Sequence, residues 1–157
     1  MSRQGALEDE RGFTLIEVIV TIVIMGIVFA ISSSIWFEMA ESRRVDSATN
    51  QVVADLRLAH TQATNRLIDT SFVVPSPDSS TYEVGPDGDV DTMTLPGDDQ
   101  GTPKTKIVAA TTITFHAEGG AEIDPAGAIN ITVAAIDGDP FHTINVNTVT
   151  SRVKVVN

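Results

Sequence analysis

Residues 13–31 form an apolar run with a single charged side chain, the carboxylate of Glu17. The only other polar side chains in the run are those of Thr14 and Thr21. A carboxylate at the centre of a membrane helix costs about 2.5–3.5 kcal/mol by insertion scales for Asp, and less near a helix end. An ionisable residue in such a segment therefore indicates a function, and it needs a partner of opposite charge.

The apolar run is long enough to cross a bilayer. If residues 13–37 are helical, the segment extends about 37 Å at 1.5 Å per residue. This length exceeds the roughly 30 Å hydrocarbon core of a membrane. Trp36 and Phe37 would then lie where aromatic side chains anchor a helix at the membrane surface.

Two general interpretations fit this segment. One is a plain single-span membrane anchor. The other is a cleaved secretory signal, with residues 18–31 as its apolar part and a small-residue cleavage site near residues 30–32. Secretory leaders are basic, whereas residues 8–10 are all acidic and outnumber Arg3 and Arg11. The leader and the position of Glu17 therefore argue against a secretory signal.

The residues Gly12-Phe13-Thr14-Leu15-Ile16-Glu17, preceded by Arg11, resemble the class III signal of type IV prepilins and type II secretion pseudopilins. The resemblance implies that a prepilin peptidase cuts between Gly12 and Phe13 on the cytoplasmic side, and that the new Phe13 terminus is N-methylated. It also implies that Glu17 pairs with the Phe13 amine of a neighbouring subunit and sets the register of a filament. A helix would place Phe13 and Glu17 on one face, since they are four residues apart. The simpler alternative is a Glu17 side chain that extends to the membrane surface.

The chain departs from this family in two places. Leaders of the family are usually basic, and Ser34 stands where many major pilins have a proline. Two arginines lie on each side of the apolar run, so the charges do not fix its orientation. A cytoplasmic N-terminus therefore rests on the resemblance.

Helical periodicity continues beyond the apolar run. Apolar residues recur at spacings of three and four, at Val45, Ala48, Val52, Leu56, Ala59, Ala63 and Leu67. No Pro or Gly lies between Ile27 and Phe72, so one continuous helix over about residues 13–67 is the simplest prediction. Its first half is apolar all round and its second half on one face, which is typical of a shaft packed on a globular head.

Beyond Leu67 the apolar residues alternate with polar ones, and turn residues separate the short runs. This pattern predicts antiparallel strands. The predicted strands are residues 71–74, 81–84, 92–95, 106–110, 112–116, 121–123, 129–135, 142–147 and 152–156. With the long helix they predict an α+β fold in which the helix stripe covers one face of the sheets.

Short motifs in residues 112–155 are similar in order to those of the GspH/FimT group, the minor pseudopilins of type II secretion and minor pilins of type IV pili. These motifs are Thr112-Ile113-Thr114-Phe115, Gly119-Gly120-Ala121, Ile129-Asn130-Ile131, Thr143-Ile144-Asn145-Val146 and Ser151-Arg152-Val153-Lys154-Val155. The resemblance implies a pilin-like fold with a β-sandwich head of two small sheets. The group usually has a glycine before the arginine, where this chain has Ser151.

Three carboxylates alternate in a loop rich in Gly and Pro, at Asp87, Asp89 and Asp91. Calcium prefers clustered oxygen ligands on flexible backbone, and Asp98 and Asp99 could complete a shell. The spacing resembles the start of an EF-hand loop but lacks its Gly and its terminal Glu. A solvated acidic loop without metal is the alternative, and short motifs of this kind often match by chance.

Arg152 and Lys154 alternate on the last predicted strand, so they share a face. In some minor pilins of this group a basic motif at this place contacts DNA during uptake. The chain has a net charge of −11, with 10 Lys and Arg against 21 Asp and Glu. Because phosphate binding needs many cations, an exposed strand face paired with nearby Asp is favoured over nucleic-acid binding.

The sequence offers no set of catalytic residues. It has no cysteine, which excludes disulfides, thiolate catalysis and Cys-ligated zinc. His60, His116 and His142 show no metal-ligand spacing, and no Ser or Thr lies in a nucleophile motif. We therefore expect a protein that is not an enzyme.

These observations predict a leader (residues 1–12), a membrane and filament-core half-helix (13–37), an amphipathic half-helix (38–70) and a β-rich head (71–157). They predict a subunit, minor by its resemblance, of a type IV pilus-like filament or a type II secretion pseudopilus. Its expected partners are other pilins, the prepilin peptidase and an inner-membrane assembly platform. Its expected location is the bacterial inner membrane, with the head in the periplasm, and then the filament. The alternatives are a DNA-binding minor pilin for DNA uptake and a major pilin of an adhesive or motility pilus.

Overall fold

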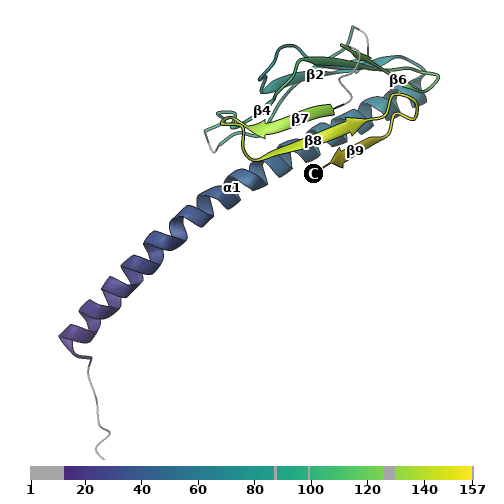
Figure 1. Ribbon diagram of the computed structural model, residues 1–157. Coiled ribbons are helices and arrows are strands. Elements are labelled where there is room, and N and C mark those ends of the chain that lie inside the picture. Colours follow the sequence, from purple (N-terminus) through teal and green to yellow (C-terminus); the bar gives the residue numbers. More distant parts are fainter. Residues whose placement is uncertain (1–12, 87, 99, 126–129, 157) are drawn as a thin grey trace, which may run out of the picture. The chain divides into compact units, whose positions relative to one another are not determined.

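The computed structural model describes residues 13–86, 88–98, 100–125 and 130–156. The chain forms two compact units, one ending at Glu38 and the other beginning at Met39. Helix α1, Leu15–Arg66, contributes residues to both units, and every strand belongs to the second (Figure 1). The helix prediction for residues 13–67 is confirmed to within two residues at each end.

Helix α1 ends where the backbone turns left-handed. Leu67 has φ 54°, the conformation in which helices commonly end. Arg66 lies in the last turn, where a positive charge interacts favourably with the helix dipole. Strand β1 follows almost directly, and it begins at Thr70.

The predicted apolar stripe is the buried face of α1 in the second unit. Its members Val45, Ala48, Val52, Leu56, Ala59 and Ala63 are all fully buried. The prediction was wrong for Leu67, whose side chain is 75% exposed. The left-handed backbone at Leu67 takes its side chain off the helical stripe, so the stripe ends one turn earlier.

The described residues form nine strands, which are β1 (Thr70–Val74), β2 (Thr81–Pro86), β3 (Asp91–Thr94), β4 (Thr105–Ile107), β5 (Thr111–Phe115), β6 (Ala121–Asp124), β7 (Asn130–Ala135), β8 (Phe141–Val146) and β9 (Val153–Val156). All nine predicted strands are confirmed. The largest difference is at β4, which ends three residues earlier than predicted. The chain bends directly after Ile107, the residue that also forms a bridge to Ser79.

The strands form two antiparallel sheets. The first has the order β3-β2-β1-β5-β6 and the second the order β4-β7-β8-β9. The bridge between Ser79 and Ile107 connects the β1–β2 turn to β4 and so ties the two sheets together. Strand β9 is an edge strand, paired only with β8.

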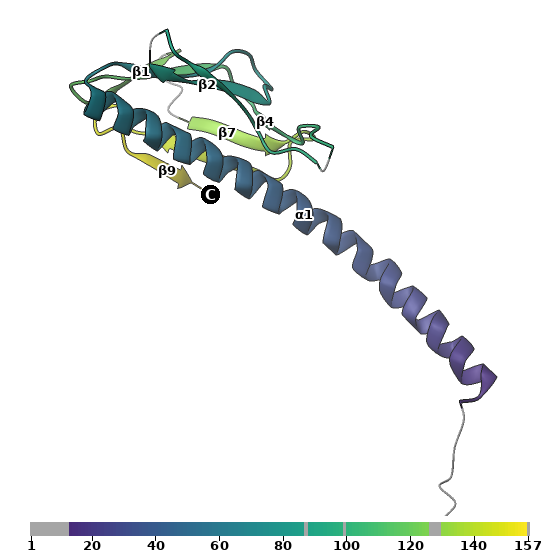
Figure 2. The same cartoon turned by 180° about the vertical axis from the view of Figure 1, so that it is seen from behind.

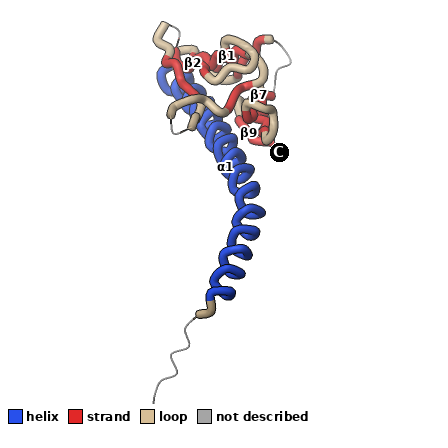
Figure 3. Tube along the Cα trace, turned by 90° about the vertical axis from the view of Figure 1, so that its left-hand side faces the viewer, coloured by secondary structure: helices blue, strands red, loops and turns tan. Residues whose placement is uncertain are grey.

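One hydrophobic core holds the second unit together. It joins the buried stripe of α1 to inward side chains of both sheets, among them Phe72, Tyr82, Ile113, Val133 and Ile144. The rings of Phe72 and Tyr82 pack with centroids 4.9 Å apart. Figure 3 shows the strands of both sheets beside this half of α1, and in Figure 2 the helix is drawn between β9 and the strands β1, β2 and β7. The expected α+β pilin-like fold is therefore confirmed.

Candidate functional site

The start of α1 is held by a side chain that the sequence analysis did not single out. Thr14 precedes the first helical residue, and its Oγ1 accepts a hydrogen bond from the backbone N–H of Glu17 at 3.3 Å. The Glu17 N–H also lies 3.1 Å from the Thr14 carbonyl oxygen. The pattern Thr14-x-x-Glu17 before an apolar run is the sequence signature of a capping box. This signature was present in the sequence, so the cap could have been predicted.

Polar groups gather on one face of the first two helical turns. Thr14, Glu17 and Thr21 follow one another at spacings of three and four, and the hydroxyl of Thr21 donates to the Glu17 carbonyl oxygen at 2.7 Å. Glu17 is exposed, so its carboxylate is accessible to a partner. Phe13 is 83% exposed and lies before the helix rather than within it. Gly12 lies outside the described residues.

The first unit leaves its apolar side chains uncovered. Leu15, Ile16, Ile22, Met25 and Phe29 are each more than 60% exposed. By length and composition α1 could cross a membrane, and none of its most apolar stretch is buried within the structure. The hydroxyl of Ser32 donates to the Val28 carbonyl oxygen at 2.8 Å, which satisfies a polar group inside this stretch. An uncovered apolar surface of this extent needs lipid or other protein against it.

The acidic loop connects β2 to β3. Asp89 and Asp91 are exposed, and the Asp89 N–H donates to the Pro86 carbonyl oxygen at 3.0 Å. A Cβ on Gly85 would lie 2.4 Å from the Asp89 carbonyl oxygen, so only glycine fits there. Asp87 lies outside the described residues. Among the described residues no three His, Asp or Glu side chains form a metal-binding group, and the calcium site stays a prediction.

Asp98 has partners of its own within the chain. Its Oδ1 accepts hydrogen bonds from the N–H groups of Thr102 at 2.9 Å and Gln100 at 3.0 Å. Lys104 lies 3.5 Å from Oδ2. The bond from Thr102 is the main cause that holds the pKa of this carboxyl below its usual range. Asp98 therefore closes its loop through backbone groups and Lys104.

Arg152 and Lys154 lie at edge strand β9, and both are exposed. A shallow groove of about 350 Å³ is lined by both of them and by Asn145, Asn147 and Thr150. Asn147 organises the turn before β9, because its Oδ1 accepts hydrogen bonds from the N–H of Val149 at 3.0 Å and of Thr150 at 2.8 Å.

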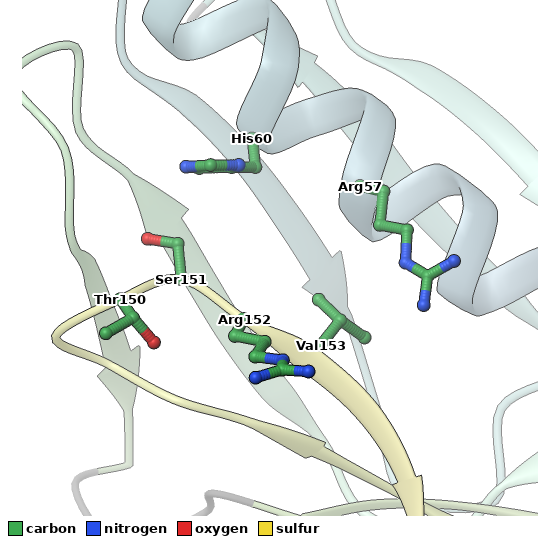
Figure 4. A pocket seen from close by; sticks show the side chains of 6 residues that line it. All are labelled: Arg57, His60, Thr150, Ser151, Arg152 and Val153. Carbon is green, nitrogen blue, oxygen red and sulfur yellow. The ribbon is translucent and has the colours of Figure 1, made fainter.

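A second hollow, of about 560 Å³, lies between this turn and α1. Its lining residues are Arg57, His60, Thr150, Ser151, Arg152 and Val153. Figure 4 shows Arg57 and His60 on the helix facing the segment 150–153 across it. Arg152 lines both hollows, whereas Lys154 lines only the first.

Ser151 has an unusual backbone and an unusual side chain. Its φ is 52°, in the left-handed region that favours glycine. Only 4% of the residue is exposed, and its Oγ is buried. Its Oγ has no hydrogen-bond partner among the described residues. The backbone at this position gives a physical reason for the glycine that the GspH/FimT group usually has there.

Each strand-region histidine pairs with a carboxylate far away in sequence. His116 Nδ1 lies 3.0 Å from Asp69 Oδ2, and His142 Nε2 lies 2.7 Å from Asp46 Oδ1. The first pair joins the end of β5 to the segment after α1, and the second joins β8 to α1. The ring of His60 packs on Phe115 with centroids 5.7 Å apart. Sequence spacing gave no signal for these pairs, because the fold creates them.

The hydrogen bond from Asp69 is the main cause that raises the pKa of His116. Asp69 also accepts a hydrogen bond from the Ala117 N–H at 2.9 Å. That bond is the main cause that lowers the pKa of Asp69, and the bond to His116 adds to it.

Two family models match the chain. The prokaryotic N-terminal methylation motif matches residues 9–33, which contain the capped start of α1 and its uncovered apolar stretch. The model of the type II transport protein GspH matches residues 48–150, from the buried stripe of α1 to the turn before β9. No curated protein matches the chain, and no solved structure matches it.

Proposed function

Since this chain belongs to the GspH family of type II transport proteins, we propose that it is a minor subunit that a prepilin peptidase processes before assembly. Both matching families are structural families of filament-forming proteins, so the chain is a pilin or pseudopilin subunit of a type IV pilus-like or type II secretion filament. The finer steps proposed below are cleavage, methylation, membrane storage and pairing through Glu17.

The observation that carries the proposal is the single exposed carboxylate at the start of an uncovered apolar helix. Glu17 has apolar neighbours on both sides, Ile16 and Val18, which are 66% and 46% exposed. A carboxylate in such surroundings is stabilised by an adjacent cation, because the attraction between two charges grows as the effective dielectric falls. Cleavage between Gly12 and Phe13 would create that cation, the α-amino group of Phe13.

The proposed cation has two possible carboxylate partners. Phe13 stands before the helical cap, so its amine is free to reach outward. Pairing with Glu17 of the same chain would lower the cost of the carboxylate in the membrane. Pairing with Glu17 of a neighbouring subunit would fix the axial position of one helix against the next. We propose that the second pairing replaces the first as the subunit leaves the inner membrane, with its head in the periplasm.

Mass spectrometry of the mature N-terminus tests the processing step. The expected species begins at Phe13 and carries one methyl group. A Gly12→Leu variant should keep its intact leader and stay in the membrane fraction. An intact Met1 terminus in the assembled protein would contradict the proposed cleavage.

Substitution of Glu17 tests the assembly step. Glu17→Gln keeps the size and shape of the side chain but removes its charge and replaces one acceptor oxygen by a donor NH2 group. The variant should insert into the inner membrane at the wild-type level and be absent from sheared filaments. Because the chain has no cysteine, a single engineered cysteine in the head allows cross-linking to measure neighbouring subunits without background. Normal filament incorporation of Glu17→Gln would contradict the proposed pairing.

A further inference from the structure

The hollow between α1 and the turn before β9, here called the arginine groove, is lined by two arginines, whereas the chain as a whole is acidic. It is lined by Arg57 and His60 from the helix and by Thr150, Ser151 and Arg152 from the turn. Arg57 and Arg152 are both exposed. The net charge of the chain is −11, so two guanidinium groups at one hollow form a local positive site on an acidic protein.

Neither arginine is neutralised by the described part of the chain. The ion pairs of the described residues use Lys104, Lys106, His116 and His142, and none of them uses Arg57 or Arg152. Guanidinium groups bind carboxylates through two parallel hydrogen bonds. The arginine groove therefore offers an anionic ligand two guanidinium groups that form no ion pair with the described residues.

Ser151 supplies an independent observation at the same place. Its hydroxyl is buried and has no partner among the described residues, and in Figure 4 it is directed away from the guanidinium groups of Arg57 and Arg152. A buried hydroxyl without a hydrogen bond is costly, and the left-handed backbone at this position would be less strained with glycine. A ligand that accepts a hydrogen bond from Ser151 would offset the cost of leaving this hydroxyl without a partner.

The size of the groove limits its ligand. A duplex nucleic acid presents a long track of phosphates and needs many cations along it, whereas two arginines flank a hollow of about 560 Å³. An acidic peptide segment needs only one or two cations and one hydroxyl. The chain itself displays such a segment: Asp89 in the β2–β3 loop and Asp91 at the start of β3 are exposed and lie outside every described ion pair.

We propose that the arginine groove binds an acidic loop of an adjacent subunit in the filament, with a carboxylate between Arg57 and Arg152 and a second oxygen of the same loop accepting a hydrogen bond from Ser151. The contact rests on the proposed function, because it needs a neighbouring subunit. It lies in the head and is separate from the pairing of Glu17.

The test is a binding titration with the full chain in detergent micelles. One probe is a peptide of residues 85–100, and the other is a generic peptide of alternating Gly and Asp. A control peptide of residues 85–100 carries Asn at every Asp. We expect both acidic peptides to bind, the Asn peptide to bind at least tenfold more weakly, and affinity to fall as salt rises. No saturable binding of either acidic peptide would overturn the proposal.

Variants locate the site. Arg57→Gln and Arg152→Gln should each weaken binding about tenfold, the range of a charged hydrogen bond. Lys154→Gln removes the same charge two residues further along the chain and outside the groove, so its affinity should change less than twofold. An equal loss for Lys154→Gln and Arg152→Gln would contradict the groove and indicate a general effect of charge.

Ser151→Gly separates binding from folding. It removes the hydroxyl and relieves the strained backbone, so the variant should unfold at the same or a higher temperature and yet bind the acidic peptide several-fold more weakly. Unchanged affinity in Ser151→Gly would remove Ser151 from the site. A single-stranded DNA oligonucleotide that binds the wild type while both peptides fail would overturn the proposal in favour of nucleic acid. Since the titration needs no filament, its failure leaves the tests of cleavage and of Glu17 unaffected.

Discussion

The side chains of His116 and Asp69 meet with Nδ1 and Oδ2 3.0 Å apart, although 47 positions separate them in sequence. The contact ties the end of β5 to the segment that connects α1 to β1. Glu122 lies 3.9 Å from the other ring nitrogen of His116. The head therefore holds a titratable link between its helix and its first sheet.

This link should make head stability depend on pH. The pKa of His116 is raised, so its stabilising effect is complete below the unfolded value of about 6.5 and is lost as pH rises through the folded value. The pKa of Asp69 is lowered, so its effect is present above the unfolded value of about 3.9 and is lost as pH falls through the folded value. The pair should stabilise the head most between about pH 4 and 6.5.

Thermal unfolding of the full chain at pH 5.5 and pH 8 measures this effect. His116→Gln should reduce the difference in melting temperature between the two pH values. His142→Gln leaves the pair of His116 and Asp69 intact. This variant should therefore retain the contribution of His116 to the difference in melting temperature. An unchanged difference in His116→Gln would show that the pair does not stabilise the head.

Tyr82 should resist ionisation as long as the head is folded. Its hydroxyl lies 2.5 Å from Asp55 Oδ2 and accepts from Gln51 Nε2 at 3.0 Å. Burial is the main cause that raises the pKa of Tyr82, and the bond to Asp55 adds to it. Since the chain has one tyrosine, ultraviolet absorbance reports on this residue alone. The folded protein should show almost no tyrosinate at pH 10.5, and the unfolded protein should show a majority.

Removing the Tyr82 hydroxyl should destabilise the head. Tyr82→Phe keeps the ring that packs on Phe72 but leaves Asp55 and Gln51 without this partner. The expected loss is about 1–3 kcal/mol in the free energy of unfolding, the cost of an unsatisfied polar group. Chemical denaturation of the wild type and the variant measures it, and a change below about 0.5 kcal/mol, the usual range of a neutral surface substitution, would be contrary to this expectation.

Two leucines two positions apart on α1 provide a matched test of the helix packing. Leu56 is fully buried, and Leu58 is 49% exposed. Leu56→Ala should cost about 2–5 kcal/mol through lost burial and the cavity it leaves. Leu58→Ala should change stability by less than about 0.5 kcal/mol. Equal effects in denaturation experiments would mean that this face of α1 is not the one packed on the sheets.

The cap at Thr14 should stabilise the start of α1 independently of the charge on Glu17. Thr14→Ala removes the oxygen that accepts from the Glu17 N–H, at a cost of about 1 kcal/mol, whereas Thr14→Ser retains it. Amide hydrogen exchange of the first helical turn in micelles should be faster in Thr14→Ala and unchanged in Thr14→Ser. Equal exchange in the two variants would remove the capping role.

Sequence reasoning located the helix and all nine strands because each is encoded locally. The helical period of residues 45–63 and the turn residues between short alternating runs are visible without a partner. The strand order is not encoded in this way. Strand β1 pairs with its sequence neighbour β2 and also with the distant strand β5, and the second pairing depends on the packing of the whole core.

The candidate site shows the same division. The motif at Gly12–Glu17 and the basic pair Arg152 and Lys154 were apparent in sequence, although their roles remain predictions. The arginine groove was not, because Arg57 and Ser151 come from distant segments and meet only in the folded head. The backbone angle of Ser151, which gives the residue its significance, also depends on the turn built around Asn147.

The pairing of β1 with β5 places Thr70 opposite Phe115, so the first sheet cannot form until β5 has been synthesised. Domains whose contacts are distant in sequence fold on the order of milliseconds to seconds, far more slowly than a helix forms. Helix α1 is synthesised first and needs no other segment to complete its hydrogen bonds. By length and composition α1 could cross a membrane, so its N-terminal half would be available for the proposed insertion while β5 to β9 are still being made.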